Sequence, residues 1–131
     1  MAHTPGPWKW RINRSTKRIY LTGRGLTVMD FVRYGMSNAA PRFLDSEHLM
    51  QRADELAVNI PGEDHHSDWN QDIGHPDARL IAAAPMLLEA LKVMVEQEVN
   101  YMLINNLGNP EEQQAVINSR AAIAAAEGKG K

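Results

Sequence analysis

The chain has 131 residues, of which 44% are hydrophobic, and a formal net charge of −2. This length is typical of a single domain with a modest core, and the apolar content is too high for an intrinsically disordered chain. The sequence contains no cysteine, which excludes disulfides and thiolate chemistry and agrees with a reducing cytosol. No apolar run reaches membrane-spanning length, and the first residues lack the cationic and hydrophobic segments of a secretion signal.

We therefore expect residues 1–131 to form one soluble intracellular domain. Its basic, β-rich part covers residues 1–43, a short helix and a polar loop cover 44–74, and a helical part covers 75–127.

The small net charge hides a strong segregation along the chain. Residues 1–42 contain eight basic side chains and one acid, a net charge of +7, whereas residues 43–131 contain six basic and fifteen acidic side chains, a net charge of −9. An arginine-rich third on an acidic protein indicates a local surface that attracts anions. The alternative is that the basic strands face acidic helices of the same molecule or of another subunit, and charge alone does not decide between them.

Three short strands are expected in the first third of the chain. Residues 8–12 alternate between apolar and basic side chains, the period-two pattern of a strand with an aromatic inner face. Residues 18–22 and 26–33 follow as two further strands, and the Gly-Arg-Gly run at 23–25 is typical of a hairpin turn. Because the connections are short, an antiparallel meander is the expected arrangement.

The middle of the chain is expected to hold one helix and one long loop. Asp45 or Ser46 can cap a helix that runs to about Val58, since apolar side chains recur there at helical spacing. Residues 59–74 are rich in glycine, charged residues and histidine, and they predict a surface loop. A loop of this length is often functional.

Two helices are expected after residue 75. Pro76 suits the first turn of a helix, and Pro85 should interrupt its hydrogen-bond ladder, so we expect a short helix, a kink and a longer helix towards Leu107. The Gly-Asn-Pro run at 108–110 ends that helix and begins a last one that runs to about Ala126.

The expected fold class is α+β, with an N-terminal antiparallel sheet of three or more strands packed on a C-terminal helical hairpin. The apolar stripe of the long helix is widened by Leu87, Met94 and Tyr101. Such a face is broader than a small sheet can cover, so we also expect a homo-oligomer.

Three blocks of the sequence resemble a family of small bacteriophage and prophage proteins. They are HTPGPW at 3–8, VMDFVRYGM at 28–36 with APRF at 40–43, and HPDARLIAAAP at 75–85 with LLEAL at 87–91. The resemblance implies a viral or prophage origin and a location in the host cytoplasm, and it implies no particular activity. The order of a basic sheet and a helical hairpin also looks like the phage sponge proteins that sequester cyclic ADP-ribose signals of Thoeris immunity.

Arg79 is the centre of the predicted ligand-binding site. It lies in the first turn of the central helix, where backbone N–H groups and a guanidinium together suit a phosphate or carboxylate. Asp77 can accept from ribose hydroxyls or hold Arg79, Arg24 and Arg33 could add phosphate contacts, and Trp69 could stack on a base. The alternative is that Arg79 pairs with a nearby acid and that the aromatic residues belong to the core.

A second group of residues suits a metal ion. His65, His66 and Asp68 lie close together in the sequence, and His75 follows nine residues after His66. These side chains are ligand types for zinc or another divalent ion, which would support hydrolysis of a phosphoester. The alternative is an exposed polar loop, because the spacing matches no metalloprotease signature.

We expect a non-catalytic phage accessory protein, with an anti-defence role, that binds a small phosphorylated, nucleotide-type ligand and uses no cofactor. The first alternative is an inhibitor or assembly factor that binds a host protein through its acidic helices, and the second is a metal-dependent hydrolase. Nucleic acid is disfavoured as a partner because the acidic remainder of the chain would repel its backbone, and no membrane partner is expected.

Overall fold

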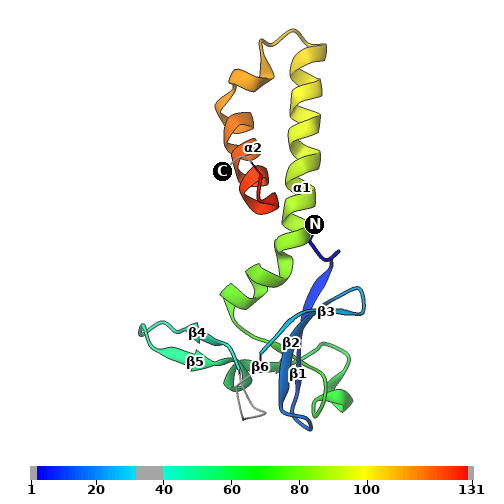
Figure 1. The fold of residues 1–131 in the computed structure, drawn as a ribbon, viewed down its shortest axis with the longest axis vertical. Helices are drawn as coiled ribbons and strands as arrows, with labels where there is room; N and C mark the ends of the chain where they lie inside the picture. Colours follow the sequence, from blue (N-terminus) through cyan, green and yellow to red (C-terminus); the bar gives the residue numbers. More distant parts are fainter. Residues whose placement is uncertain (1–2, 32–39, 130–131) are drawn as a thin grey trace. The chain divides into compact units, whose positions relative to one another are not determined.

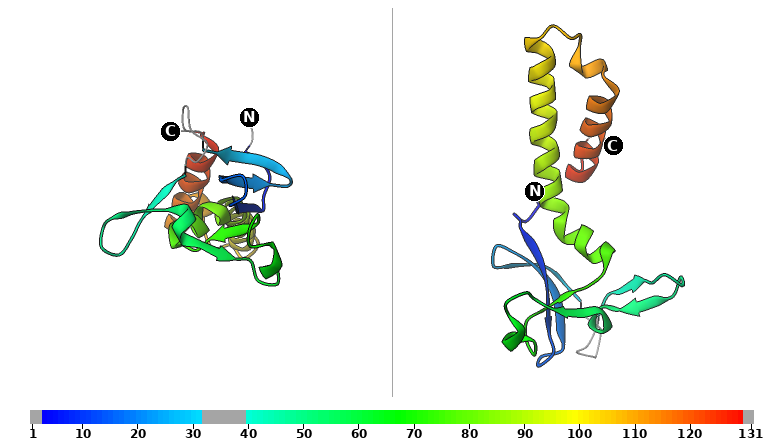
Figure 2. Two further views of the ribbon diagram at one scale, coloured as in Figure 1. Left: turned by 90° about the horizontal axis from the view of Figure 1, so that it is seen from below. Right: turned by 180° about the vertical axis from the view of Figure 1, so that it is seen from behind.

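The computed structural model describes residues 3–31 and 40–129, which form two compact units. The first unit spans Thr4–Ala84, and the second holds the helices from Pro85 onward. Figure 1 shows the order of the strands and helices, and Figure 2 gives two further views of the same ribbon. The class is α+β, as the sequence predicts.

The first unit is built on a five-stranded antiparallel sheet with the order β3-β2-β1-β7-β6, beside which lies a separate two-stranded hairpin, β4-β5. The strands of the main sheet are β1 (Trp8–Asn13), β2 (Arg18–Gly23), β3 (Leu26–Asp30), β6 (Ala57–Asn59) and β7 (Gln71–Ile73). The small hairpin consists of β4 (Arg42–Leu44) and β5 (Met50–Arg52). Three N-terminal strands in an antiparallel meander are therefore confirmed. The third was expected to reach Arg33, but β3 ends at Asp30, and residues 32 and 33 lie outside the described residues.

The turn between β2 and β3 is tighter than the predicted three-residue run. Gly23 pairs with Leu26, so that Arg24 and Gly25 alone form the turn, with φ of 50° and 79°. Positive φ at both central residues is the geometry of the two-residue hairpins that match the strand twist. Gly23 serves a different purpose, because a Cβ there would lie 2.7 Å from the Pro5 carbonyl oxygen and 2.8 Å from Trp8 Cδ1.

The helix predicted from Asp45 or Ser46 to Val58 is wrong. The carboxylate of Asp45 accepts hydrogen bonds from the backbone N–H groups of Glu47 (2.8 Å) and Leu49 (2.9 Å), and its own N–H donates to the Leu49 carbonyl (2.8 Å). Asp45 thus closes the β4-β5 hairpin instead of capping a helix, since aspartate satisfies turns and helix starts by the same kind of bond. After β5, the short 3-10 helix η1 (Ala53–Leu56) leads into β6.

The loop predicted over residues 59–74 contains a strand of the main sheet. A 3-10 turn, η2 (Asp64–His66), precedes β7, and β7 lies between β1 and β6. Gln71 is buried although it is polar, because its amide accepts from Arg14 Nε and donates to Asn59 Oδ1, both at 2.8 Å. A buried amide satisfied in this way carries little penalty, and its polarity is what hides the strand in the sequence.

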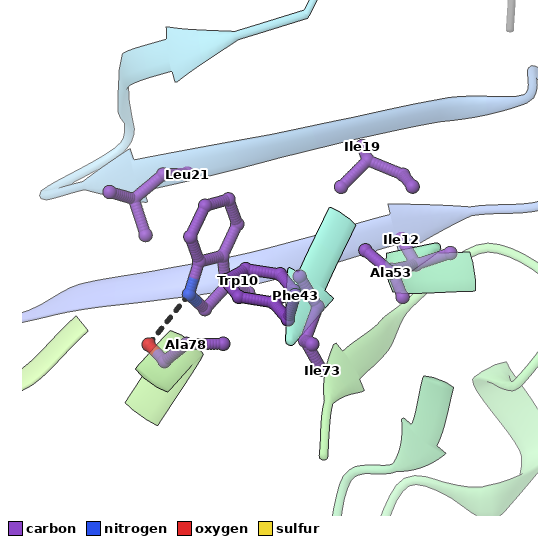
Figure 3. Packing of buried hydrophobic residues seen from close by; sticks show 8 residues of the cluster. All are labelled: Trp10, Ile12, Ile19, Leu21, Phe43, Ala53, Ile73 and Ala78. Carbon is purple, nitrogen blue, oxygen red and sulfur yellow. Dashed lines mark hydrogen bonds between the residues drawn. The ribbon is translucent and has the colours of Figure 1, made fainter. Parts of the chain in front are cut away.

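The core of the first unit surrounds Trp10, which is 1% exposed (Figure 3). Its indole Nε1 donates a 2.8 Å hydrogen bond to the Ala78 carbonyl, in the first turns of helix α1 (Pro76–Ile104). The ring also stacks on Phe31 and meets Phe43 edge-on, with centroids 6.3 and 6.4 Å away. The other buried members of the cluster are Ile12, Ile19, Leu21, Ala53 and Ile73.

Helix α1 is continuous from Pro76 to Ile104 with Pro85 inside it, so the expected division into two helices is wrong. A proline removes one hydrogen bond from the ladder, and the alanine- and leucine-rich turns around it have high helix propensity. No helix in the described part of the chain is long and apolar enough to cross a membrane.

The second unit contains the greater part of α1, the 3-10 turn η3 (Pro110–Glu112) and helix α2 (Gln114–Glu127). Asn109 was expected to cap the last helix, but it caps the 3-10 turn η3 instead, and its side chain accepts a 3.0 Å bond from the Glu111 N–H. Helix α2 begins at Gln114, after its N-cap Gln113, whose side chain accepts from the Val116 N–H. Val95, Met102 and Val116 are buried in this unit, in which α1 and α2 run side by side (Figures 1 and 2).

An ion pair between Lys92 on α1 and Glu127 on α2 links the two helices near the end of the chain. The hydrogen bond between the two side chains, more than any other cause, raises the pKa of Lys92 and lowers the pKa of Glu127. Lys92 therefore stays protonated to a higher pH, and Glu127 stays deprotonated to a lower pH, than either would without the other.

Replacement of Trp10 by phenylalanine should lower the free energy of unfolding by about 1–3 kcal/mol, because the indole hydrogen bond and part of the ring volume are lost. Trp69→Phe is the matched control, since Trp69 is 48% exposed, and its effect should stay within about 0.5 kcal/mol. Urea denaturation followed by circular dichroism measures both. Equal effects of the two substitutions would contradict the central role of Trp10.

The Glu127 carboxylate should make the α1–α2 pairing sensitive to acid. Because its pKa is lowered in the folded state, the stability that it contributes is present above the ordinary glutamate pKa and is lost as the pH falls through the lowered value. The fall in melting temperature between neutral and strongly acidic pH should therefore be smaller in Glu127→Gln than in the unmodified chain. Glu112→Gln, which removes an exposed carboxylate elsewhere in the same unit, should leave the fall unchanged.

Candidate functional site

A cavity of about 270 Å³ opens in the first unit, at the turn that joins β1 and β2. Its walls come from the ends of these two strands, from their turn, and from Ala40 and the β5–η1 junction. The described residues that line it are Ile12, Asn13, Arg14, Lys17, Arg18, Ile19, Ala40, Arg52 and Asp54. Two of them, Ile12 and Ile19, belong to the hydrophobic core, so one wall of the cavity is rigid.

Four of these lining residues are cations, Arg14, Lys17, Arg18 and Arg52, and one is an acid, Asp54. The hairpin turn brings the first three together. Its geometry is fixed by Asn13, whose side chain accepts a 3.1 Å bond from the Thr16 N–H, and by Lys17, whose φ is 57°. Like charges held this close repel one another, and an anion between them relieves the repulsion.

Arg14 is oriented by neutral acceptors. Its Nε donates to the Gln71 side chain at 2.8 Å, and its Nη2 donates to the Asp54 carbonyl oxygen at 3.2 Å. Lys17 forms no ion pair with any residue of the described ranges 3–31 and 40–129. Both side chains thus bring a positive charge to the cavity, and neither forms an ion pair with a carboxylate of the described residues.

The two other cations are partly balanced. Arg52 Nε lies 3.0 Å from the Asp54 carboxylate. Arg18 Nη2 lies 3.6 Å from Asp30, both side chains being about half exposed, and its guanidinium stands 5.0 Å above the ring of Tyr20. Exposed pairs of this kind are weak, so either arginine can exchange its carboxylate for a better anion.

The chemistry of this cavity suits a small anion such as a phosphate group. Guanidinium groups bind phosphate oxygens with two parallel hydrogen bonds, and a lysine adds a point charge. The described lining contains no serine, cysteine or histidine, and its one carboxylate is paired with Arg52. The cations that face the cavity are therefore suited to holding a phosphate group.

The ligand-binding residues predicted from the sequence lie elsewhere. Arg24, in the β2–β3 turn, donates from Nε to the Gly6 carbonyl at 3.0 Å. Asp77 and Arg79 are exposed on the first turns of α1, and Trp69 packs against the ring of His66 at 4.3 Å. No hydrogen bond or ion pair between any two of these four occurs in the described part of the chain, and none of them lines the cavity. Arg33 lies outside the described residues.

The start of α1 is already occupied by His75, which acts as its N-cap. The His75 carbonyl accepts from the Arg79 N–H and its Nδ1 accepts from the Asp77 N–H, each at 3.0 Å. Because Nδ1 is an acceptor, Nε2 carries the proton and donates to the Leu44 carbonyl at 2.8 Å. Two backbone N–H groups predicted to face a phosphate are therefore satisfied within the chain.

The predicted metal ligands are only partly brought together. The rings of His65 and His66 lie 3.7 Å apart in η2, but His75 stacks on Phe43 at 5.0 Å and caps α1. Within residues 3–31 and 40–129, no group of three or more histidine, cysteine, aspartate or glutamate side chains could hold a metal ion. The described residues thus offer no ligand set for the hydrolase alternative.

Sequence reasoning counted Arg14, Lys17 and Arg18 in the basic third of the chain but did not select them. A signal is present in the sequence, because these three cations fall within five residues at the connection between two predicted strands, Arg18 being the first residue of the second strand. Arg52 and Asp54 were hidden by the incorrect helix at 45–58, which gave them no reason to approach that turn.

The family model described as Salmonella phage P22 protein Y8K6 matches residues 1–130 of the chain. No curated protein and no solved structure gives a match. The matched region takes in the basic turn, the β4-β5 hairpin and both helices. The chain therefore belongs to this family of small phage proteins, Salmonella phage P22 protein Y8K6, in agreement with the resemblance carried by its three sequence blocks.

Proposed function

We propose that this phage protein is an accessory protein of the host cytoplasm that binds a small phosphorylated ligand without changing it chemically. The observation that carries the proposal is the approach of four cations, Arg14, Lys17, Arg18 and Arg52, to one cavity with a single acid in its described lining. A nucleotide used by the host as an immune signal is a ligand of this class, and holding it would give the protein an anti-defence role.

The cavity is prepared for an anion before the ligand arrives. Arg14 is held by Gln71 and by the Asp54 carbonyl, and Arg52 is held by the Asp54 carboxylate. Side chains that are already ordered lose less conformational freedom when they bind, which favours affinity. The ligand's negative charge also relieves the repulsion among the cations, so binding should stabilise the folded state.

The size of the cavity limits which part of a ligand it can enclose. A volume of about 270 Å³ lies just below the roughly 300–1,000 Å³ range of small-molecule sites. A phosphate with an attached sugar fits this range better than a whole dinucleotide. The rest of a larger ligand would extend outward past the exposed residues of the turn.

The second candidate function is an inhibitor or assembly factor that binds a host protein through the helices. The exposed acids of α1, which include Glu89, support it. Binding of that kind would not depend on the cavity cations. It would be weakened instead by substitutions at Glu96 and Glu98, two exposed acids of α1.

Isothermal titration calorimetry with inorganic phosphate, adenosine and guanosine nucleotides and cyclic nucleotides tests the proposal. Replacing Lys17 or Arg14 by glutamine should weaken the binding of a phosphorylated compound about tenfold or more, because a charge-assisted hydrogen bond is worth about 1.5–3 kcal/mol. The affinity should also fall as salt is added.

Lys9→Gln and Arg24→Gln are matched controls, since each removes one positive charge from the same sheet without touching the cavity. Both should bind as the unmodified chain does. If no phosphorylated compound binds, or if the controls lose as much affinity as the cavity variants, the proposed function is wrong.

A further inference from the structure

Helix α1 carries apolar side chains on more than one side. Its Val95 and Met102 are buried, with Leu88, Leu91 and Val99 partly buried around them. A helix that served only to pack against α2 would be polar on the rest of its surface. The remainder of α1 includes exposed acids, but it also carries large exposed apolar side chains, and this excess of apolar surface needs an explanation.

Nine positions of α1 form what we call the outer face: Met86, Leu87, Ala90, Val93, Met94, Gln97, Asn100, Tyr101 and Ile104. All nine are exposed, and none of them is charged. Met94 is 66% exposed and Ile104 is 79% exposed. Charged residues of the same helix, such as Glu89, Lys92 and Glu96, fall outside this set.

The outer face follows a seven-residue repeat. Leu87, Met94 and Tyr101 are each seven residues apart, and Ala90, Gln97 and Ile104 follow three residues after each of them. These are the a and d positions of a heptad, with residues 86, 93 and 100 at g. Residues spaced in this way form the seam along which one helix supercoils around another.

The exposed area also matches what a stable pair of chains needs. Six large side chains of the outer face are half or more exposed, which amounts to on the order of 800 Å², about the area that each partner contributes to a standard interface. A continuous patch of this size is larger than monomers usually leave open to water.

We propose that the outer face of α1 binds the same face of α1 in a second copy of this chain, in a parallel two-stranded coiled coil. A heptad seam requires a partner helix with the same repeat, and a two-fold axis along the seam lets one surface be its own partner. Gln97, at a d position, carries an amide, which both donates and accepts and can therefore pair with its own copy. Asn100, at a g position, faces an e position of the other helix.

The charges beside the outer face allow this pairing. Glu98 stands at an e position, which in a parallel pair faces a g position of the other helix. The g positions are Met86, Val93 and Asn100, so no like charges meet across the seam. In an antiparallel pair, by contrast, e positions face each other, which places the Glu98 carboxylates of both helices along the same edge of the seam.

Sedimentation equilibrium of the full chain at micromolar concentration tests this inference. The unmodified chain should have twice the monomer mass of 14.7 kDa, whereas Met94→Glu should shift it to the monomer, because two buried carboxylates would face each other at one a position. Ala121→Glu, at an exposed position of α2, adds the same charge and should leave the dimer intact. A monomeric unmodified chain, or a dimer that survives Met94→Glu, would overturn the proposal.

Cross-linking gives a second measurement that does not depend on a disruptive variant. The sequence has no cysteine, so a single introduced thiol reports on its own position. Met94→Cys should form a covalent dimer on mild oxidation, since a positions of a parallel pair lie within disulfide distance of each other, and Ala121→Cys should not. Failure of Met94→Cys to cross-link would exclude the parallel seam. Neither result depends on the cavity, so the two proposals fail or succeed separately.

Discussion

The hydrogen bond from the Trp10 indole to the Ala78 carbonyl joins the middle of the sheet to the beginning of the long helix. A buried indole N–H without an acceptor would cost roughly 1–3 kcal/mol, so the sheet can close over Trp10 only where a carbonyl meets it. Phe31 and Phe43 pack around the same ring and bring the end of β3 and the β4-β5 hairpin to it. The positions of the other elements in this unit follow from that contact.

The cavity also depends on the packing around Trp10. With β1 anchored by Trp10 and Ile12, the turn at its far end projects Arg14, Lys17 and Arg18 beyond the core. Ala53, fully buried in the same cluster, draws the β5–η1 junction against the sheet and so carries Arg52 and Asp54 to the turn. The cations lie around one cavity because the apolar residues between them are packed in the core. A basic site can therefore form on a chain whose net charge is −2.

Much of the fold follows from local patterns in the sequence. The strand at residues 8–12, a turn at the glycine run 23–25 and a helix start at Pro76 agree with the structure, although the turn proves to be two residues long. These signals depend on neighbouring residues only. Asp45 was misassigned because its carboxylate can satisfy a turn or a helix start equally well, and the choice is made by the β4-β5 pairing.

The sequence predicts an anion-binding surface, but it does not predict which cations line the candidate site. An excess of positive charge in residues 1–42 indicates an anion-binding surface, yet the choice among its cations depends on contacts between segments far apart in the chain. Arg14 and Gln71 are separated by 57 positions, and Arg52 reaches the turn only through the burial of Ala53. Arg79, by contrast, lies at a helix start that the sequence predicts, but His75 caps that helix, and its Nδ1 accepts from the Asp77 N–H.

The side chain of Gln71 connects the cavity residue Arg14 to strand β7 of the sheet. Its buried amide binds Arg14 on one side and Asn59 of β6 on the other, and β7 itself shares one paired position with β1, Ile12 opposite Gln71. A strand with so little backbone pairing to one neighbour opens more easily than the rest of a sheet. A ligand that orders the Arg14 guanidinium therefore also stabilises β7, through the side-chain amide of Gln71. Ligand binding at the cavity and local opening of β7 are thus thermodynamically coupled. Amide hydrogen exchange in β7 should consequently slow when the cavity is occupied.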